Sequence, residues 1–129
     1  MANIVLDASA ILAVIFEDAG AERVASHLPG AMASSVNVAE VMTKLVDLGM
    51  PHETVDAVIA GLQLAVLPFD LDHAAETAQL RIHTRDAGLS LGDRACLALA
   101  KIENVPALTS DKAWKGLRKS VGVKVEMTR

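Results

Sequence analysis

Short apolar runs alternate with longer segments of mixed polarity along the whole chain. Residues 4–6 form a continuous apolar run of the kind found in a strand buried on both faces. The same signals predict strands at 31–34, 65–69, 105–109 and 121–125, and Pro68 and the alternating valines of the last segment favour sheet edges. Strands separated by helices are typical of a parallel α/β sheet. The pattern therefore predicts about four to five short parallel strands.

The segments between these strands carry helix signals, with stops at Pro29-Gly30, Gly49 and Gly88. Helices are expected at 8–16, 21–28, 36–48, 51–64 and 71–87, with a shorter one around Trp114. Ser35 and Asp70 are expected to cap two of them. In the long helix, the buried face is predicted from apolar spacing to consist of Leu71, Ala74, Ala75, Ala78 and Ile82. Residues 95–100 are apolar nearly all round, which predicts a central buried helix.

The composition fits a single domain spanning residues 1–129, long enough to form a core. Hydrophobic residues make up 52% of the chain and aromatic residues 2%, so the core is expected to be aliphatic. The single cysteine, Cys96, excludes an internal disulfide and a cysteine-based zinc site, as expected for a cytoplasmic protein. No signal peptide or membrane-spanning segment is predicted.

The formal net charge of −4 does not favour nucleic acid as a partner, because phosphate binding requires positive charge. Basic residues are nevertheless concentrated near the end, where only Glu126 opposes Lys112, Lys115, Arg118, Lys119, Lys124 and Arg129. This segment is either a solvated surface or a local patch for phosphates. Arg94 is open to two interpretations as well, a phosphate contact or a pair with a neighbouring acid.

Four acidic residues occupy informative positions. Asp7 and Asp111 each follow a predicted strand, Asp93 lies in the first turn of the buried helix, and Glu40 lies in the helix after the second strand. If the strands are parallel, Asp7 and Asp111 share one edge of the sheet, where ligands bind in open α/β folds.

Each acid also has a purely structural interpretation. Asp7 and Asp111 can cap the helices that follow them, and Asp93 lies three residues after Ser90, as in a capping box. Glu40 can pair with Lys44 on one helix face. Together, however, the four acids suit a hard divalent cation, because oxygen ligands favour Mg²⁺ or Mn²⁺ and the cation offsets their repulsion. Such a metal can activate water for phosphoryl displacement.

Four stretches in order resemble the PIN-domain family, and most of all the ribonuclease toxins of bacterial VapBC toxin–antitoxin modules. They are Ile4-Val5-Leu6-Asp7-Ala8-Ser9-Ala10, Ser35-Val36-Asn37-Val38-Ala39-Glu40-Val41, Leu89 to Ala100, and Ala107-Leu108-Thr109-Ser110-Asp111-Lys112. The resemblance implies that Asp7, Glu40, Asp93 and Asp111 form the catalytic, metal-binding quartet. It also implies that Ser9 and Thr109 support this quartet and that Asn37 orients Glu40.

The resemblance further implies a three-layer α/β/α fold, a homodimer, an RNA substrate, Mg²⁺ or Mn²⁺ as cofactor, and a VapB-type antitoxin that blocks the site. The expected activity is metal-dependent RNA cleavage by activated water. Arg94, Lys112, Lys115, Arg118 and Lys119 are the candidate RNA contacts. The chain departs from the family at Gly92, where a second acidic residue is common, and in its overall acidity.

Two other classes remain as alternatives. A receiver-like signalling module would need an acidic pair after the first strand, but Asp7 stands alone. A dehalogenase-type phosphatase would need an Asp two residues after Asp7, where this chain has Ser9. An inactive PIN module that only binds is the remaining possibility. Trp114 is expected in the core or its rim rather than stacked on a base, and the four histidines are expected at the surface.

Overall fold

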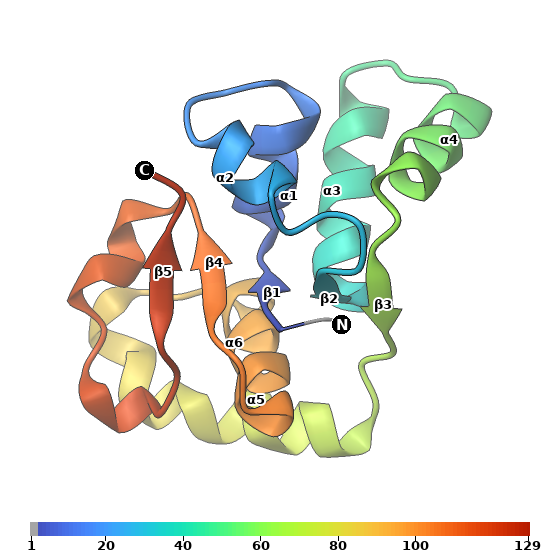
Figure 1. Cartoon of the computed structure of the whole chain (residues 1–129). Helices are drawn as coiled ribbons and strands as arrows, with labels where there is room; N and C mark the ends of the chain where they lie inside the picture. The colour runs from blue at the N-terminus through green and yellow to red at the C-terminus, as the bar shows by residue number, and fades with distance from the viewer. Residues whose placement is uncertain (1–2) are drawn as a thin grey trace.

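The computed structural model describes residues 3–129, which form a five-stranded sheet with helices on both faces (Figure 1). The strands are β1 (Val5–Leu6), β2 (Met32–Ser34), β3 (Ala65–Leu67), β4 (Ala107–Thr109) and β5 (Val125–Met127). Their order is β3-β2-β1-β4-β5, and every neighbouring pair is parallel. The expectation of a parallel sheet with β3 and β5 at its edges is confirmed.

The helices are α1 (Ala8–Ile15), α2 (Ala21–Ala25), α3 (Ser35–Asp47), α4 (His52–Leu62), α5 (Leu71–Thr84) and α6 (Leu91–Glu103). Three short 3₁₀ turns complete the chain: η1 (Arg85–Ala87), η2 (Lys112–Gly116) and η3 (Lys119–Val121). Within residues 3–129, no helix combines the length and the apolar character needed to cross a membrane.

Alternate side chains of β1 enter two separate cores, which explains its continuous apolar run. Ile4 and Leu6 pack in the core shared with α1, α2, α3 and α4. Val5 packs on the other face, in the core formed with α6 and the 3₁₀ turns. Each strand of the sheet centre is therefore covered on both sides, which confirms the three-layer α/β/α arrangement.

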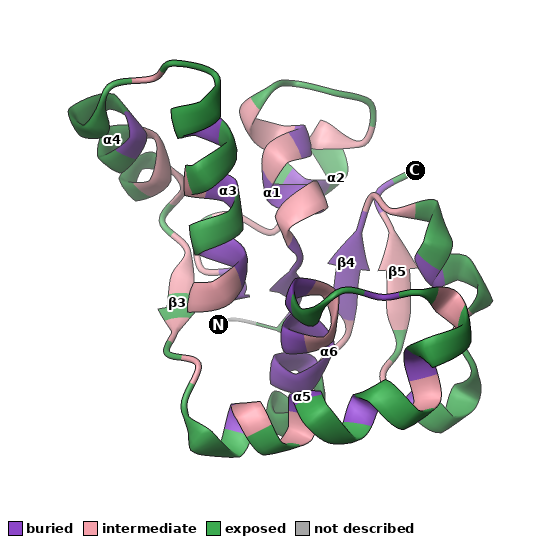
Figure 2. Cartoon of the chain, turned by 180° about the vertical axis from the view of Figure 1, so that it is seen from behind, coloured by how far each residue is buried: buried purple, intermediate pink, exposed green. Residues whose placement is uncertain are grey.

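Helix α6 is the most deeply buried helix, as its apolar sequence predicts. Residues 95–100 are all buried, and Figure 2 shows much of α6 in purple, in front of the sheet. Trp114 packs in the same core and is 1% exposed, so it does not offer its ring to a base. The expected core role of Trp114 is confirmed.

Helix α5 contradicts the predicted apolar face. Leu71 is 83% exposed and Ile82 is 64% exposed, whereas the buried side chains are His73, Thr77 and Leu80, together with Thr84. The buried face of α5 therefore consists mainly of polar side chains, which pack against α6. Apolar spacing alone does not identify this face. Thr84 Oγ1 donates to Leu80 O within α5, and Arg94 Nη1 of α6 donates to Thr77 O. The buried His73 also contradicts the surface position expected for every histidine.

Several element ends differ from the predicted ones. Ser34, not Ser35, caps α3, since its side chain accepts from Val36 N, while Ser35 Oγ accepts from Phe69 N. Helix α2 ends at Ala25 rather than 28, and β5 begins only at Val125 because Val121 belongs to η3. Helix α5 ends at Thr84 rather than 87, because Arg85–Ala87 form η1. The remaining differences are one or two residues, as is usual at frayed element ends.

The strand order places a switch point beside β1. The chain steps outward from β1 to β2 and β3, then returns through α5 and α6 to add β4 on the other side of β1. Connections from β1 and β4 therefore diverge above their carboxyl ends, and such a crevice is where open α/β sheets bind ligands. Asp7 and Ser110 are the first residues after these two strands.

Candidate functional site

Asp7 is the centre of the carboxyl edge, and hydroxyl groups surround it. Its side chain is 3% exposed, and it caps α1 by accepting from Ala10 N at 2.9 Å. Ser9 Oγ donates to Asp7 Oδ1 at 2.8 Å, and Thr109 Oγ1 donates to Asp7 Oδ2 at 2.7 Å. Thr109 also accepts from Asp111 N at 3.0 Å, so one hydroxyl links β4 and the chain after it to the acid after β1. The capping interpretation of Asp7 is therefore confirmed, and the site interpretation stays a prediction.

The Asp7 carboxylate is buried without a cation among residues 3–129 that pairs with it. Burial raises the pKa of Asp7 from 3.8 to about 6, and the negative charge of Asp93 raises it further. The hydrogen bonds from Thr109, Ala10 and Ser9 oppose this rise. A bound cation would stabilise the charged form that burial disfavours.

Glu40 and Asn37 lie one turn apart on α3 and reach toward the start of α6. Asn37 Nδ2 donates to Glu40 Oε1 at 2.8 Å and to Gly92 O at 2.9 Å. Asn37 is 1% exposed, whereas Glu40 is exposed. The contact is the one that an orienting role of Asn37 requires, although that role in catalysis stays a prediction.

Asp93 and Asp111 each use one carboxylate oxygen to cap a helical turn. Asp93 Oδ2 accepts from Ser90 N, and Ser90 Oγ accepts from Asp93 N, which completes the capping box that the sequence predicts. Asp111 Oδ1 accepts from Ala113 N at the start of η2. The other oxygen of each has no hydrogen bond within residues 3–129, and a carboxylate can accept several contacts at once.

Cys96 is a buried residue of α6 whose pKa is affected by three of the acids. Burial raises the pKa of its thiol well above its usual value, and the charges of Asp7, Asp93 and Glu40 raise it further. The charges of acids from three segments therefore all act on one buried residue of α6. Asp111 joins them through its backbone, by the bond to Thr109, while its carboxylate points to η2.

The donor chemistry of these residues fits a hard divalent cation. All four side chains offer oxygen ligands, and the buried, unpaired charge of Asp7 is a site that a cation would stabilise. As the side chains are placed, no three His, Cys, Asp or Glu groups within residues 3–129 lie close enough to share a metal ion. Asp93 and Asp111 are instead held by their helix caps.

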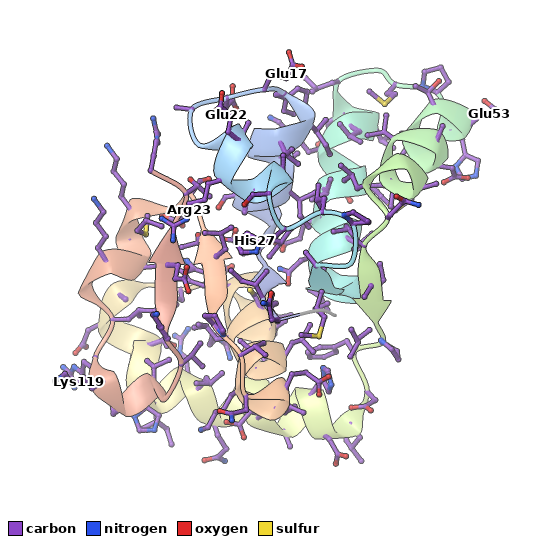
Figure 3. All side chains as sticks on the ribbon, viewed as in Figure 1. Glu17, Glu22, Arg23, His27, Glu53 and Lys119 are labelled. Atoms are coloured by element: carbon purple, nitrogen blue, oxygen red, sulfur yellow. The ribbon has the colours of Figure 1, made fainter. Side chains whose placement is uncertain are left out.

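Three of the five predicted RNA contacts, Lys115, Arg118 and Lys119, line one surface hollow. Arg94 turns toward α5, where its Nη1 donates to Thr77 O, and Arg118 pairs with Asp86. Lys119 begins η3, on the way to the amino end of β5, and Figure 3 shows it at the lower left of the molecule. Lys112 and Lys115 are exposed and follow Asp111 directly in η2, so they are the members closest to the acids along the chain.

Two residues at this edge escaped the sequence-based prediction. Arg129 lines a surface hollow together with Ser9 and Ser110, and its basic character was the only signal for it. Gly92 lies against Glu40, because a Cβ built on Gly92 would come within 2.5 Å of Glu40 Cδ. The sequence marked Gly92 only as a departure from the family pattern.

Solved structures show the same fold over nearly the whole chain. DNA-bound VapBC from Salmonella typhimurium superposes with a TM-score of 0.77 at 18% identity, covering 100% of both chains. A toxin–antitoxin complex from Klebsiella pneumoniae gives 0.72 at 18% identity, covering 98% of both chains. The sarcin-ricin loop cleaving toxin VapC20 from Mycobacterium tuberculosis gives 0.69 at 19% identity, covering 90% of this chain and 97% of the other.

Comparison with curated protein sequences gave no significant match. The family model described as PIN domain matches residues 4–119, which is most of the chain. The strand order, the acids at the carboxyl edge and this match agree. The chain belongs to the PIN domain family.

Proposed function

We propose that this PIN domain is a metal-dependent endoribonuclease that acts as the toxin of a type II toxin–antitoxin pair. The observation that carries the proposal is the buried Asp7 carboxylate at the sheet switch point, whose pKa is raised by burial and by the charge of Asp93. The solved structures with this fold include a toxin that cleaves the sarcin-ricin loop, which makes RNA the favoured substrate.

Asp7, Asp93 and Asp111 would hold Mg²⁺ or Mn²⁺, and Glu40 would complete the ligand set or position the attacking water. The bound cation would activate water and neutralise charge on the scissile phosphate. Ser9 and Thr109 hold both Asp7 oxygens, so this carboxylate stays oriented when it ionises. Asn37 restrains the Glu40 carboxylate, which would accept the proton of the water as its oxygen adds to phosphorus.

The reaction is a hydrolysis. Water adds to the scissile phosphorus and loses a proton, the opposite P–O bond breaks in line, and the leaving ribose oxygen takes up a proton to become a hydroxyl. The site stands at an exposed edge, with Glu40 and Lys112 open to solvent, so a chain of RNA can approach it.

The partners follow from the same relatives. Three of the structures with this fold are described as toxin–antitoxin or VapBC complexes, two of them bound to DNA. We infer a VapB-type antitoxin that covers the acidic edge, a homodimer of this chain, and a cytoplasmic location where RNA is accessible.

The decisive experiment uses the protein purified under denaturing conditions to remove any bound antitoxin and then refolded. It should cleave a structured RNA in Mg²⁺ or Mn²⁺, and EDTA or Asp7→Asn should abolish cleavage. Binding of the RNA without cleavage would favour an inactive binding module. Labelling of an aspartate by acetyl phosphate would favour the receiver-like alternative.

A further inference from the structure

Gly92 is the second residue of α6, and the carboxylate of Glu40 occupies the space that a side chain would fill there. A Cβ added to Gly92 would overlap both carboxylate oxygens of Glu40 and lie 2.5 Å from its Cδ. We propose that Gly92 is a positioning residue whose missing side chain fixes where the Glu40 carboxylate lies. The catalytic consequence rests on the proposed nuclease function, whereas the contact itself does not.

The backbone of Gly92 gives no other reason for a glycine. Its φ is not in the left-handed region, unlike that of five other glycines in the chain, so an alanine fits the helix. Alanine is also the better helix former. The glycine therefore disfavours α6 slightly, and the close approach of Glu40 accounts for it.

Asn37 connects the two partners of this contact. Its Nδ2 donates to Glu40 Oε1 and to Gly92 O, at 2.8 and 2.9 Å. Because both partners only accept hydrogen bonds, the amide of Asn37 has one possible orientation, and its Oδ1 is left without a partner within residues 3–129. The arrangement holds Glu40 from one side by a hydrogen bond and lets it lie against α6 on the other.

A methyl group at residue 92 would move the side chain of Glu40 rather than the backbone. The overlapping atoms are the far end of a flexible, exposed side chain, which can rotate away into solvent. The fold should therefore tolerate Gly92→Ala, while the Glu40 carboxylate leaves Asn37. Because Gly92→Ala should leave the fold intact and move only the Glu40 carboxylate, it distinguishes a positioning role of Gly92 from a role in folding.

The test compares Gly92→Ala with Gly61→Ala, a helical glycine of α4 with open space around its Cβ and no positive φ. The first measurement is the side-chain amide signal of Asn37 in the ¹H–¹⁵N spectrum of metal-free protein. Gly92→Ala should move this signal to its position in Glu40→Ala, and Gly61→Ala should leave it unchanged. An unmoved Asn37 signal in Gly92→Ala would overturn the proposal.

The second measurement is Mn²⁺ affinity by calorimetry, which should fall about 10-fold or more in Gly92→Ala and stay at the wild-type value in Gly61→Ala. Unchanged affinity in Gly92→Ala would overturn the role toward the metal. If the Asn37 signal moves but wild type binds no Mn²⁺, the positioning of Glu40 stands and the proposed nuclease function fails.

A thermal unfolding cycle covers the case in which Gly92→Ala folds poorly. In the Glu40→Ala background, Gly92→Ala should raise Tm as Gly61→Ala does, because the overlapping carboxylate is gone. In protein that keeps Glu40, Gly92→Ala should raise Tm less than Gly61→Ala does, or should lower Tm. If Gly92→Ala is equally harmful without Glu40, the glycine serves the packing of α6 and the proposal is wrong.

Discussion

The two sides of the acidic edge hold their carboxylates by opposite means. On the β1–β4 side, Asp7 is 3% exposed and receives hydrogen bonds from two hydroxyls and one backbone amide. On the α3–α6 side, Glu40 is exposed and receives one hydrogen bond, from Asn37, while it lies over Gly92.

The difference teaches how one edge can hold one acid tightly and another loosely, as the proposed roles of a metal ligand and a base require. Burial makes the charge of Asp7 unfavourable until a cation arrives, as its raised pKa indicates. Glu40 is exposed and does not carry that penalty. Its position therefore depends on the hydrogen bond from Asn37 and on the space beside Gly92. We expect substitutions on the Asp7 side to change stability and metal affinity together, and those on the Glu40 side to act mainly on affinity.

Replacing the buried charge should have the largest effect. Asp7→Asn should lower Mn²⁺ affinity by more than about 100-fold, since it removes a ligand rather than a supporting group. The same change should stabilise the metal-free protein at pH 7 by about 1 to 3 kcal/mol, because a charge held at a raised pKa of about 6 is removed. Calorimetry and urea unfolding measure the two effects.

Asp47→Asn is the matched control, since Asp47 is an exposed aspartate at the end of α3. It should leave Mn²⁺ affinity unchanged and alter stability by less than about 0.5 kcal/mol. If Asp7→Asn binds Mn²⁺ as tightly as wild type, Asp7 is not a metal ligand. If Asp7→Asn is less stable than wild type, the buried charge of Asp7 does not destabilise the metal-free protein.

The pH dependence sharpens the same comparison. The pKa of Asp7 rises from 3.8 to about 6 on folding, so the folded chain binds this proton more tightly than the unfolded chain. The contribution of Asp7 to stability is therefore present below about pH 4 and is lost as the pH rises to about 6.

Urea unfolding of metal-free wild type and Asp7→Asn between pH 4 and 8 measures this contribution as the difference between them. The advantage of Asp7→Asn should grow from about pH 4 to about pH 6 and then level off. Apparent Mn²⁺ affinity of wild type should rise over the same interval, because the metal competes with the proton. A difference independent of pH would contradict the raised pKa.

Removing a hydroxyl from Asp7 should have an intermediate effect. Thr109→Val keeps the shape of the side chain but removes the donor to Asp7 Oδ2 and the acceptor for Asp111 N. We expect a 10- to 100-fold loss of Mn²⁺ affinity, the usual result when a partner of a metal ligand is lost, and about 1 to 3 kcal/mol of destabilisation.

Thr84→Val is the control for Thr109→Val. Thr84 is also buried, and its hydroxyl donates only to Leu80 O within α5. It should cost stability without changing Mn²⁺ affinity. Equal affinities in the two valine variants would mean that the Thr109 hydroxyl supports the fold and not the metal.

The sequence predicted the parts of this comparison that depend on local pattern. The apolar run of β1, the capping box of Ser90 and Asp93, and the buried stretch of α6 follow from neighbours along the chain. Their signals are short-range, so a single sequence contains them. Asp7 and Asp111 were found because each follows a strand. Asp93 lies in the first turn of a helix, whereas Glu40 lies within the helix after the second strand.

The features that could not be predicted are set by contacts across the fold. The strand order that puts a switch point beside Asp7 depends on where β4 adds to the sheet. The buried face of α5 is polar because α6 supplies Arg94 to Thr77 O, which no apolar spacing reveals. Gly92 was marked only as a departure from the family pattern, since the reason for this glycine is a side chain 52 positions earlier in the sequence, Glu40.

The basic residues should give the smallest effect, and they extend the comparison beyond the acids. Lys112 and Lys115 are exposed in η2, directly after Asp111, whereas Lys119 and Lys124 lie on the path to the amino end of β5. Figure 3 shows Lys119 at the lower left of the molecule. Lys115 and Lys119 line one hollow, but only the first pair follows Asp111 directly. We therefore expect phosphates on either side of a scissile bond to meet the first pair more closely than the second.

Lys112→Ala with Lys115→Ala should weaken RNA binding several-fold, and Lys119→Ala with Lys124→Ala provides a control with the same change in charge. For single-stranded RNA, each lost phosphate contact reduces the salt slope by about 0.7, so the first pair should reduce it by about 1.4. Binding measured between low and high salt by fluorescence anisotropy gives both quantities. Mn²⁺ affinity should be unchanged in both double variants, since no proposed ligand is altered. If the two double variants lose the same affinity, the effect comes from overall charge, and the residues after Asp111 only keep the surface solvated.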